Sequence, residues 1–191
     1  CVFERVRIMK YEKSVILKNG EECLIRSAAA EDAEEILEVF NRTHNETDFM
    51  LTYTDENSFD EEKERQFLTE KENSGDEIEL CAVVNGRIAG TAGIDAVGRK
   101  DKIRHRAEFG IGIAKDFWGL GIGRALTDAC IECARHAGYV QLELQAVSEN
   151  ARAACLYKSA GFTEYGRNPK GFRSRTAGWQ ELILMRMELT A

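Results

Sequence analysis

The sequence has no long hydrophobic run. Its apolar stretches are only a few residues long, whereas a transmembrane helix needs about 20 consecutive apolar residues. The charged N-terminus, with Glu4, Arg5 and Arg7, does not lead into the hydrophobic core of a signal peptide. We therefore expect neither a membrane partner nor secretion, and we expect a cytoplasmic location.

The chain also lacks a linker. It contains a single proline, and no segment rich in proline, glycine and serine divides it. With 191 residues, 43% of them hydrophobic, the chain can bury one sizeable core. We expect a single domain over residues 1–191. Residues 1–10 carry no clear pattern, so we expect a disordered or dispensable leader there, with Met9 as an alternative start of the folded chain.

Positive charge is in the minority. The sequence has 33 acidic and 26 basic side chains, which gives a net charge of −7. This balance argues against an extended nucleic-acid-binding surface and favours ordinary solubility. We therefore expect no nucleic-acid partner.

The cysteines lack the companions that a metal site requires. Cys130 and Cys133 form a CxxC motif, but no second CxxC and no pair of histidines completes a zinc site. Both residues continue the apolar stripe of an expected helix, so we interpret them as small buried hydrophobic residues. We expect no metal, and no disulfides in a chain that is not secreted.

The most informative motif that is present is a stretch of alternating glycines at Gly119, Gly121 and Gly123. An apparent strand over residues 107–113 precedes it, and a helix with apolar residues at helical spacing follows it, up to Gly138. Glycine permits a left-handed backbone, and the first N–H groups of a helix carry partial positive charge. The stretch therefore predicts a loop that binds an anion such as pyrophosphate.

Two other glycine motifs do not fit this stretch. A phosphate loop of nucleotide hydrolases ends in Gly-Lys-Ser/Thr, but Arg124 and Ala125 follow the last glycine here. A dinucleotide fingerprint, GxGxxG, would require a third glycine where the chain has Arg124 or Leu126. A structural turn without a ligand remains as the alternative for the glycines taken alone.

The stretch resembles the acetyl-CoA loop of the GCN5-related N-acetyltransferases, the GNAT family, whose pattern is Gln/Arg-x-x-Gly-x-Gly/Ala. Both glycines of that pattern match, whereas Trp118 stands in the place of the Gln or Arg and removes a side-chain donor. A later block over residues 150–162 also resembles the family, because an Asn opens a helix and a Tyr precedes a Gly-Phe strand start. The resemblance covers residues 22–189 and is strongest over residues 107–162.

The resemblance implies an α/β fold of the GNAT type, with a mixed, mostly antiparallel central sheet flanked by helices. The pattern of the chain is compatible with this fold. Its first half predicts a hairpin of strands 15–17 and 22–26 around Asn19-Gly20, a helix 31–43, a helix from a capping box at Ser58 to near Gly75, and a hairpin of strands 79–84 and 87–96 around Asn85-Gly86. Its second half predicts a strand 103–113, the helix after the glycines, a strand 141–146, a helix 151–159, and strands 162–166 and 180–188.

The resemblance also implies acetyl-CoA as co-substrate and a set of residues that hold it. The backbone of β-strand residues Ile111, Gly112 and Ile113 is expected to run along the pantetheine arm like an added strand. Asn150 is expected to donate a hydrogen bond to the cofactor arm, although its residue type serves equally well as a plain helix cap. The pyrophosphate is expected to lie against the glycine stretch, which comprises Trp118, Gly119, Leu120, Gly121, Ile122, Gly123 and Arg124.

Acetyl transfer to an amine requires a proton acceptor, a stabilised oxyanion and a proton donor for the departing thiolate. Tyr157 matches the position of the family's catalytic tyrosine and is the candidate acid; its alternative role is aromatic packing. Glu108, on the strand that leads to the glycines, is the candidate base. A proton relay through water, with Glu108 simply solvated or ion-paired, is the alternative for that role.

The acceptor is expected to be a primary amine that attacks acetyl-CoA directly in a ternary complex. Two segments expected to line the acceptor side carry opposite charge: the acidic loop 44–57 suits a cationic amine, and the basic segment 167–175 suits a carboxylate or phosphate. A small-molecule amine is the first choice. A protein N-terminus is the alternative acceptor, a catalytically silent acyl-CoA-binding module is the alternative function, and the resemblance leaves a homodimer open.

Overall fold

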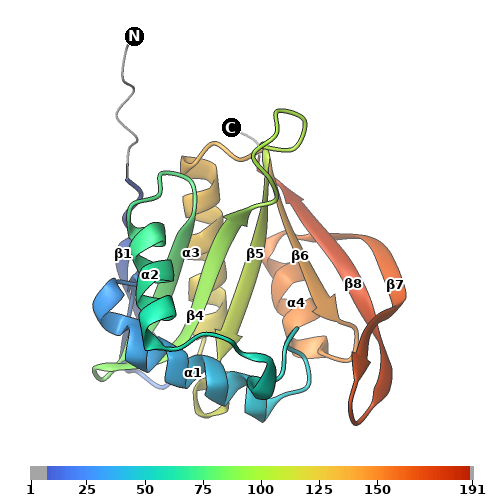
Figure 1. Ribbon diagram of the computed structural model, residues 1–191, viewed down its shortest axis with the longest axis horizontal. Coiled ribbons are helices and arrows are strands. Elements are labelled where there is room, and N and C mark those ends of the chain that lie inside the picture. The colour runs from blue at the N-terminus through green and yellow to red at the C-terminus, as the bar shows by residue number, and fades with distance from the viewer. Residues whose placement is uncertain (1–7, 190–191) are drawn as a thin grey trace.

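The computed structural model describes residues 8–189, and its centre is an eight-stranded sheet with the strand order β1-β2-β3-β4-β5-β6-β8-β7 (Figure 1). The strands are β1 (Glu12–Ile16), β2 (Glu22–Ser27), β3 (Ile78–Val84), β4 (Arg87–Ala96), β5 (Arg106–Ile113), β6 (Gln141–Val147), β7 (Thr163–Ser174) and β8 (Gly178–Glu188). The α-helices are α1 (Ala33–Glu46), α2 (Glu61–Glu72), α3 (Ile122–His136) and α4 (Ala151–Ala160), with short 3₁₀ turns at Ala30–Asp32, Thr54–Glu56 and Lys115–Phe117.

The strand pairing divides the sheet into two halves. All neighbouring strands are antiparallel except β5 and β6, which run parallel and pair only over Arg106–Glu108. Beyond Glu108 the two strands diverge, and α4 lies behind the widening gap (Figure 1). The sheet is therefore mixed and mostly antiparallel, as predicted.

The helices cover the two faces of the sheet in pairs. Helices α1 and α2 lie on one face, and α3 and α4 lie on the other (Figure 1). Along β5, Ala107 and Phe109 are buried in the core beneath α3 and α4, whereas Glu108, Gly110 and Gly112 alternate with them and face the side of α1 and α2. Strand β5 therefore contributes apolar residues to the core under α3 and α4, and Glu108 with two glycines to the face under α1 and α2.

The local signals for hairpins and for the core-facing helices are confirmed. Asn85 and Gly86 both have positive φ, 51° and 76°, as the tightest hairpin turns require. In α1 the buried residues recur at helical spacing, and in α3 the fully or nearly fully buried face includes Cys130 and Cys133. The two cysteines thus pack as small hydrophobic residues.

Several boundaries differ from the sequence predictions: β1 spans Glu12–Ile16 where residues 15–17 were predicted, and α1 spans Ala33–Glu46 where a helix 31–43 was predicted. Helix α2 is capped by Asp60, whose side chain accepts a hydrogen bond from the N–H of Lys63 at 2.9 Å, so the capping box predicted at Ser58 is wrong. Strand β5 begins at Arg106 because residues 101–105 form turns. Strand β7 continues to Ser174, whereas the predicted strand ended at residue 166, so most of the basic segment 167–175 is strand.

The extension of β7 has an identifiable reason. This strand lies at the edge of the sheet, where a proline costs little because its missing N–H faces away from the partner strand. Pro169 falls within the irregular register between Asn168 and Phe172. The proline and the run of basic residues hide the strand pattern in the sequence.

The chain is folded at least from Met9 onward. The Met9 side chain is 3% exposed, and its N–H donates to the carbonyl of Ser74 at 3.0 Å. The predicted leader therefore does not extend as far as residue 10, and its first seven residues lie outside the described part. None of the helices described between residues 8 and 189 is long and apolar enough to cross a membrane.

Candidate active site

The glycine stretch forms the turn that joins β5 to α3. Gly119 and Gly121 have φ of +82° and +106°, in the left-handed region, and α3 begins directly afterwards at Ile122. Gly121 occupies the cap position and offers no side chain to the first turn of the helix. The first N–H groups of α3 therefore remain available to an anion.

Gly123 is a glycine for a different reason. A Cβ at this position would come within 3.2 Å of the Leu156 side chain and 3.3 Å of the Ile113 side chain. Helix α3 therefore packs closely against α4 and β5 at this point, and Gly123 permits that approach.

One edge of β5 is open beside the glycine turn. The N–H of Ala114, directly after the strand, donates to the carbonyl of Ala89 on β4 at 3.0 Å. Because backbone groups alternate in direction, Ile111 and Ile113 present their N–H and C=O groups to the opposite side. No strand in the described part of the chain pairs with that side beyond Glu108, so an extended ligand can add there like a strand.

Trp118 contacts this open edge directly. Its indole N–H donates to the carbonyl of Ile113 at 2.7 Å. The side chains of Lys115 and Arg152 lie over its ring, at 5.7 Å and 5.0 Å from the centroid. The positive charge that Trp118 lacks is therefore supplied next to it by two neighbouring cations.

Lys115 and Arg152 were not predicted from the sequence as members of this site. Lys115 stands three residues before Trp118 in the chain, whereas Arg152 reaches it only because α4 packs beside the glycine turn. Arg124 was predicted to lie against the pyrophosphate, but its side chain donates to Asp128 at 2.8 Å. Its contribution to an anion site is therefore the backbone N–H.

Asn150 is the cap of α4. Its side-chain oxygen accepts a hydrogen bond from the N–H of Ala153 at 3.2 Å. The side-chain NH₂ group of Asn150 is not used by this cap and can donate elsewhere. The two roles weighed for this residue are thus chemically compatible.

Tyr157 lies on α4 and is buried in the core side of the gap between β5 and β6. Its ring packs edge-on against Phe109, with centroids 6.0 Å apart, and against Phe162 at 6.1 Å. Burial raises the pKa of the Tyr157 hydroxyl to about 12. A phenol in this environment keeps its proton at neutral pH and is available as a donor.

Glu108 stands where the pairing of β5 and β6 ends. Its side chain faces the layer of α1 and α2 and is exposed, and its cross-strand neighbours are Asp95 and Glu143. Partial burial, followed by repulsion from these two carboxylates, raises the pKa of Glu108 above its usual value. A carboxylate of raised pKa is a better proton acceptor than an ordinary glutamate.

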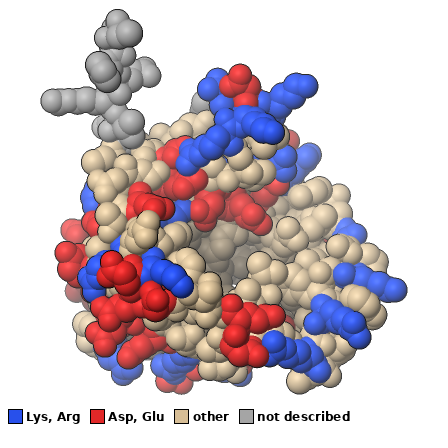
Figure 2. All heavy atoms as spheres, viewed as in Figure 1, with Lys and Arg blue, Asp and Glu red and all other residues tan. Residues whose placement is uncertain are grey.

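A cleft of about 540 Å³ lies on the same face, between the sheet and the helices α1 and α2. Its floor includes Gly110, Ile111 and Gly112 of β5, so it reaches the strand whose other side is open. Figure 2 shows a hollow in the middle of this face, with acidic side chains on both sides of it. The volume falls within the range of about 300–1,000 Å³ that small-molecule sites occupy.

Two carboxyl groups in this cleft, one buried and one half-buried, were not predicted from the sequence. Glu64 of α2 is 8% exposed, and burial raises its pKa. Burial also raises the pKa of Glu79, on β3, to about 7, although Thr91 and Lys71 oppose the shift. Neither residue belongs to a motif, because the fold alone brings α2 and β3 to the same cleft.

The two segments of opposite charge expected around the acceptor contact each other. Arg175 donates to both carboxylate oxygens of Asp55, at 2.8 Å and 2.9 Å, and its guanidinium lies 4.0 Å from the centroid of the Tyr53 ring. Arg167 is paired with Glu164 and Glu181 on its own hairpin. Lys170 and Arg173 of the basic segment lie instead over the ring of Trp179. The charges of Asp55 and Arg175 thus neutralise each other, and the two segments do not act as fully separate fields of opposite sign.

A family model described as the acetyltransferase (GNAT) family matches residues 33–162, more than half of the chain. The chain belongs to the GNAT family of acetyltransferases. The predicted fold class, the acyltransferase class and acetyl-CoA as its co-substrate are therefore confirmed at the level of the family.

Individual GNAT relatives agree with this assignment. A GNAT acetyltransferase from Streptococcus pneumoniae superposes with a TM-score of 0.83 at 32% identity, over 87% of this chain and 99% of that one. The N-alpha-acetyltransferase RimI of Mycobacterium tuberculosis is 34% identical over 88 residues, which are 46% of this chain and 53% of RimI.

A mycothiol acetyltransferase of Beutenbergia cavernae is 43% identical over 53 residues, which are 28% of this chain. The matched segment is 18% of that longer protein. The similarity therefore concerns the GNAT domain and does not identify the acceptor.

Proposed function

We propose that this GNAT protein transfers the acetyl group of acetyl-CoA to a primary amine by direct attack in a ternary complex. The observation that carries the proposal is the joint position of two sites on one strand. The open edge of β5 and the glycine turn suit the co-substrate, and the cleft on the other layer reaches Gly110–Gly112 of the same strand. An amine in the cleft and a thioester on the edge thus meet across β5.

Each step of the reaction has a candidate group. Glu108, whose pKa is raised, takes the proton from the incoming ammonium, directly or through water. Backbone N–H groups of the open β5 edge stabilise the oxyanion of the tetrahedral intermediate. Tyr157 then donates its proton to the departing CoA thiolate, which is possible because its hydroxyl remains protonated at neutral pH.

The co-substrate is held by the residues named for it above. Gly119–Arg124 bind the pyrophosphate through backbone N–H groups, and Lys115 and Arg152 beside Trp118 add positive charge. Asn150 donates its free NH₂ group to the pantetheine arm. These roles follow from the available donors and from the resemblance of the two sequence blocks.

The acceptor we propose is a small-molecule amine. The cleft has the volume of a small-molecule site, and the pairs between Asp55 and Arg175 tie the loop after α1 to the β7–β8 hairpin at its rim. A protein N-terminus is the second candidate, supported by the 34% identity to RimI over part of the chain. An extended peptide would need this rim to open.

Replacing the proposed acid tests the activity. Tyr157→Phe should lower turnover by about 10²–10⁴-fold, measured as thiol release from acetyl-CoA with an amine panel, while acetyl-CoA affinity changes little. Tyr165→Phe, at an exposed tyrosine of β7, is the matched control and should keep full turnover. Equal turnover in Tyr157→Phe would reject the acid assignment. Tight acetyl-CoA binding without thiol release from any amine, including N-terminal peptides, would instead support the silent binding module.

A further inference from the structure

The acceptor cleft has charged side chains of one sign. The charged residues that line it within the described part of the chain are Glu56, Glu64, Glu79 and Asp95, and all of them are acidic. His44 also lines the cleft, but burial lowers the pKa of its imidazole and keeps it neutral at pH 7. The cleft therefore offers no cation to a carboxylate or phosphate on the acceptor.

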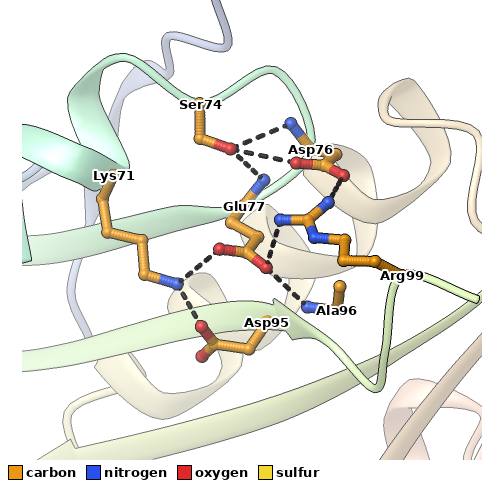
Figure 3. A network of polar contacts seen from close by, with 7 residues as sticks. All are labelled: Lys71, Ser74, Asp76, Glu77, Asp95, Ala96 and Arg99. Carbon is orange, nitrogen blue, oxygen red and sulfur yellow. Dashed lines mark hydrogen bonds and ion pairs between the residues drawn. The ribbon is translucent and has the colours of Figure 1, made fainter. Parts of the chain in front are cut away.

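Two of these carboxylates already have a partner. Glu56 lies 3.7 Å from the guanidinium of Arg175. Asp95 is paired with Lys71, whose ammonium also lies 3.5 Å from Glu77, as Figure 3 shows. Arg99 extends the same network to Glu77 at 2.7 Å. The negative charge of Asp95 is thus largely balanced from outside the cleft.

Glu64 has no such balance. More than nine-tenths of this residue is buried, it lines the cleft, and no hydrogen bond or ion pair joins its carboxylate to a described residue. The Glu64 carboxylate oxygens are not fully enclosed, because Tyr139 Oη is the one fully buried side-chain polar atom without a partner among residues 8–189. Partial burial still costs this carboxylate part of its hydration without supplying a donor. The cleft is where such a donor can reach it.

The side chain of Glu79 lies over a row of glycines on the neighbouring strands. The strand register places Glu79 opposite Gly93 on β4, and Gly93 opposite Gly110 on β5. The carboxylate of Glu79 lies over Gly93, where a Cβ would collide with its Oε2 atom. Neighbouring strands are about 4.8 Å apart, so the Glu79 carboxylate over Gly93 is separated from Gly110 on β5 by about one strand spacing. Neither glycine has a side chain that would fill this space.

The remaining walls of the cleft are apolar. Helix α1 contributes Ile36, Val39 and Phe40, α2 contributes Phe67, and the loop between them contributes Met50. A hydrocarbon chain or ring between two amines would lie against these side chains and be removed from water. The cleft therefore combines an apolar wall with two carboxyl groups, those of Glu64 and Glu79, that form no ion pair with a described residue.

We infer that the acceptor is an amine with an apolar body and a second cationic group, and that Glu64 and Glu79 bind that second cation. This inference rests on the proposed function, because it names the substrate class of the same cleft. The N–H groups of the cation donate charge-assisted hydrogen bonds to the two carboxylates, while the other amine reaches the thioester over Gly110. An amino acid with a free carboxylate is rejected for lack of a basic partner.

The affinity for the cation should depend on pH. Lys71, Asp95, Glu64 and Thr91 surround Glu79, and the net effect of burial places its pKa at about 7. Below this pH Glu79 is protonated and neutral, whereas above it the second carboxylate is charged. The Michaelis constant for a dicationic acceptor should therefore fall as the pH rises from 6 to 8, provided that the acceptor itself stays fully protonated in this range.

A series of matched amines tests the inference. 1,6-Diaminohexane, hexylamine and 6-aminohexanoate have the same reacting amine and chain length, and they end in an ammonium, a methyl group and a carboxylate. We expect kcat/KM for the diamine to exceed that for hexylamine by tenfold or more, beyond the twofold factor for two equivalent amines, and 6-aminohexanoate to be the poorest. Equal kcat/KM for the diamine and hexylamine would overturn the inference while leaving acetyl transfer intact.

Two variants locate the effect. Glu64→Gln and Glu79→Gln should each remove most of the preference for the diamine, and Glu79→Gln should also abolish its pH dependence. Glu62→Gln, at an exposed position of the same helix α2, is the control and should retain both. Thermal denaturation of all three variants verifies that they are folded. A preference that survives in both Glu64→Gln and Glu79→Gln would contradict the inference.

A binding measurement separates this inference from the proposed function. If no amine releases thiol, the proposed function fails, and calorimetry of 1,6-diaminohexane with the protein loaded with CoA still tests the cation site. Binding that is lost in Glu64→Gln would support the site, whereas the absence of binding would overturn it.

Discussion

The left-handed turn before α3 gives a prediction that separates local strain from cofactor binding. Gly121 has φ of +106°, and an added Cβ there would meet no atom within 4 Å. An alanine is therefore not excluded by a clash, and its cost is conformational, roughly 1–2 kcal/mol for an L-residue held at positive φ. Gly121→Ala either destabilises the fold by this amount or relaxes the turn.

Gly138→Ala provides a matched control at the other end of the same helix. Gly138 has φ of +83°, and its added Cβ would likewise meet nothing within 4 Å. Both variants should lower the melting temperature by about 2–8 °C, since 1 kcal/mol corresponds to roughly 2–4 °C for a domain of this size. The two substitutions thus carry the same backbone cost.

Only one of the two variants, Gly121→Ala, should lower the affinity for acetyl-CoA. In Gly121→Ala, relaxation of the strained turn displaces the first N–H groups of α3. A loss of about 1–2 kcal/mol of binding free energy would weaken acetyl-CoA binding about 5- to 30-fold, because 1.4 kcal/mol corresponds to tenfold. Gly138→Ala should bind acetyl-CoA like the unmodified protein. Calorimetry measures both affinities. Equal affinities in two variants with equal melting temperatures would refute the assignment of the turn as the pyrophosphate site.

Two further predictions concern a helix cap and the proposed base. Asp60→Ala should lower the free energy of unfolding by about 0.5–2 kcal/mol in denaturant titrations, because it removes the acceptor for the N–H of Lys63, whereas Ser58→Ala should change it by much less; the reverse order would contradict the assigned cap. Glu108→Gln should lower kcat/KM at neutral pH by about 10²–10⁴-fold. In the unmodified protein kcat/KM should rise with pH as Glu108 loses its proton, at a midpoint above that of an ordinary glutamate, and a pH profile that keeps this limb in the variant would assign the base elsewhere.

Much of the fold follows from local signals in the sequence. The hairpin turns require positive φ, which Asn85-Gly86 supplies, and the apolar stripe of α3 repeats every three or four residues. The glycine turn and the helix with Asn150 and Tyr157 are likewise local, so each can be located without knowing the rest of the chain. Their mutual position, on either side of the gap beside β5, follows only from the fold.

The parts that could not be predicted depend on contacts between distant segments. Glu64 and Glu79 meet in the cleft because α2 packs over β3, and neither stands in a motif. The pair of Asp55 and Arg175 joins residues 120 positions apart, so the sequence shows two opposite charge runs and not their mutual neutralisation. Helix α2 was misplaced at its start because Ser58 and Asp60 are both good caps, and only the hydrogen bond distinguishes them.

The short pairing of β5 with β6 means that the hydrogen-bonded backbone network of the protein is incomplete. Within residues 8–189, β5 and β6 pair over only three residues, Arg106–Glu108 with their partners on β6, and the carbonyl of His105 adds bonds from the N–H groups of Val140 and Gln141. An extended pantetheine arm would continue this ladder and act as a removable structural element of the domain. Its binding would tie the halves together, so the stability of the fold would rise with the concentration of acetyl-CoA.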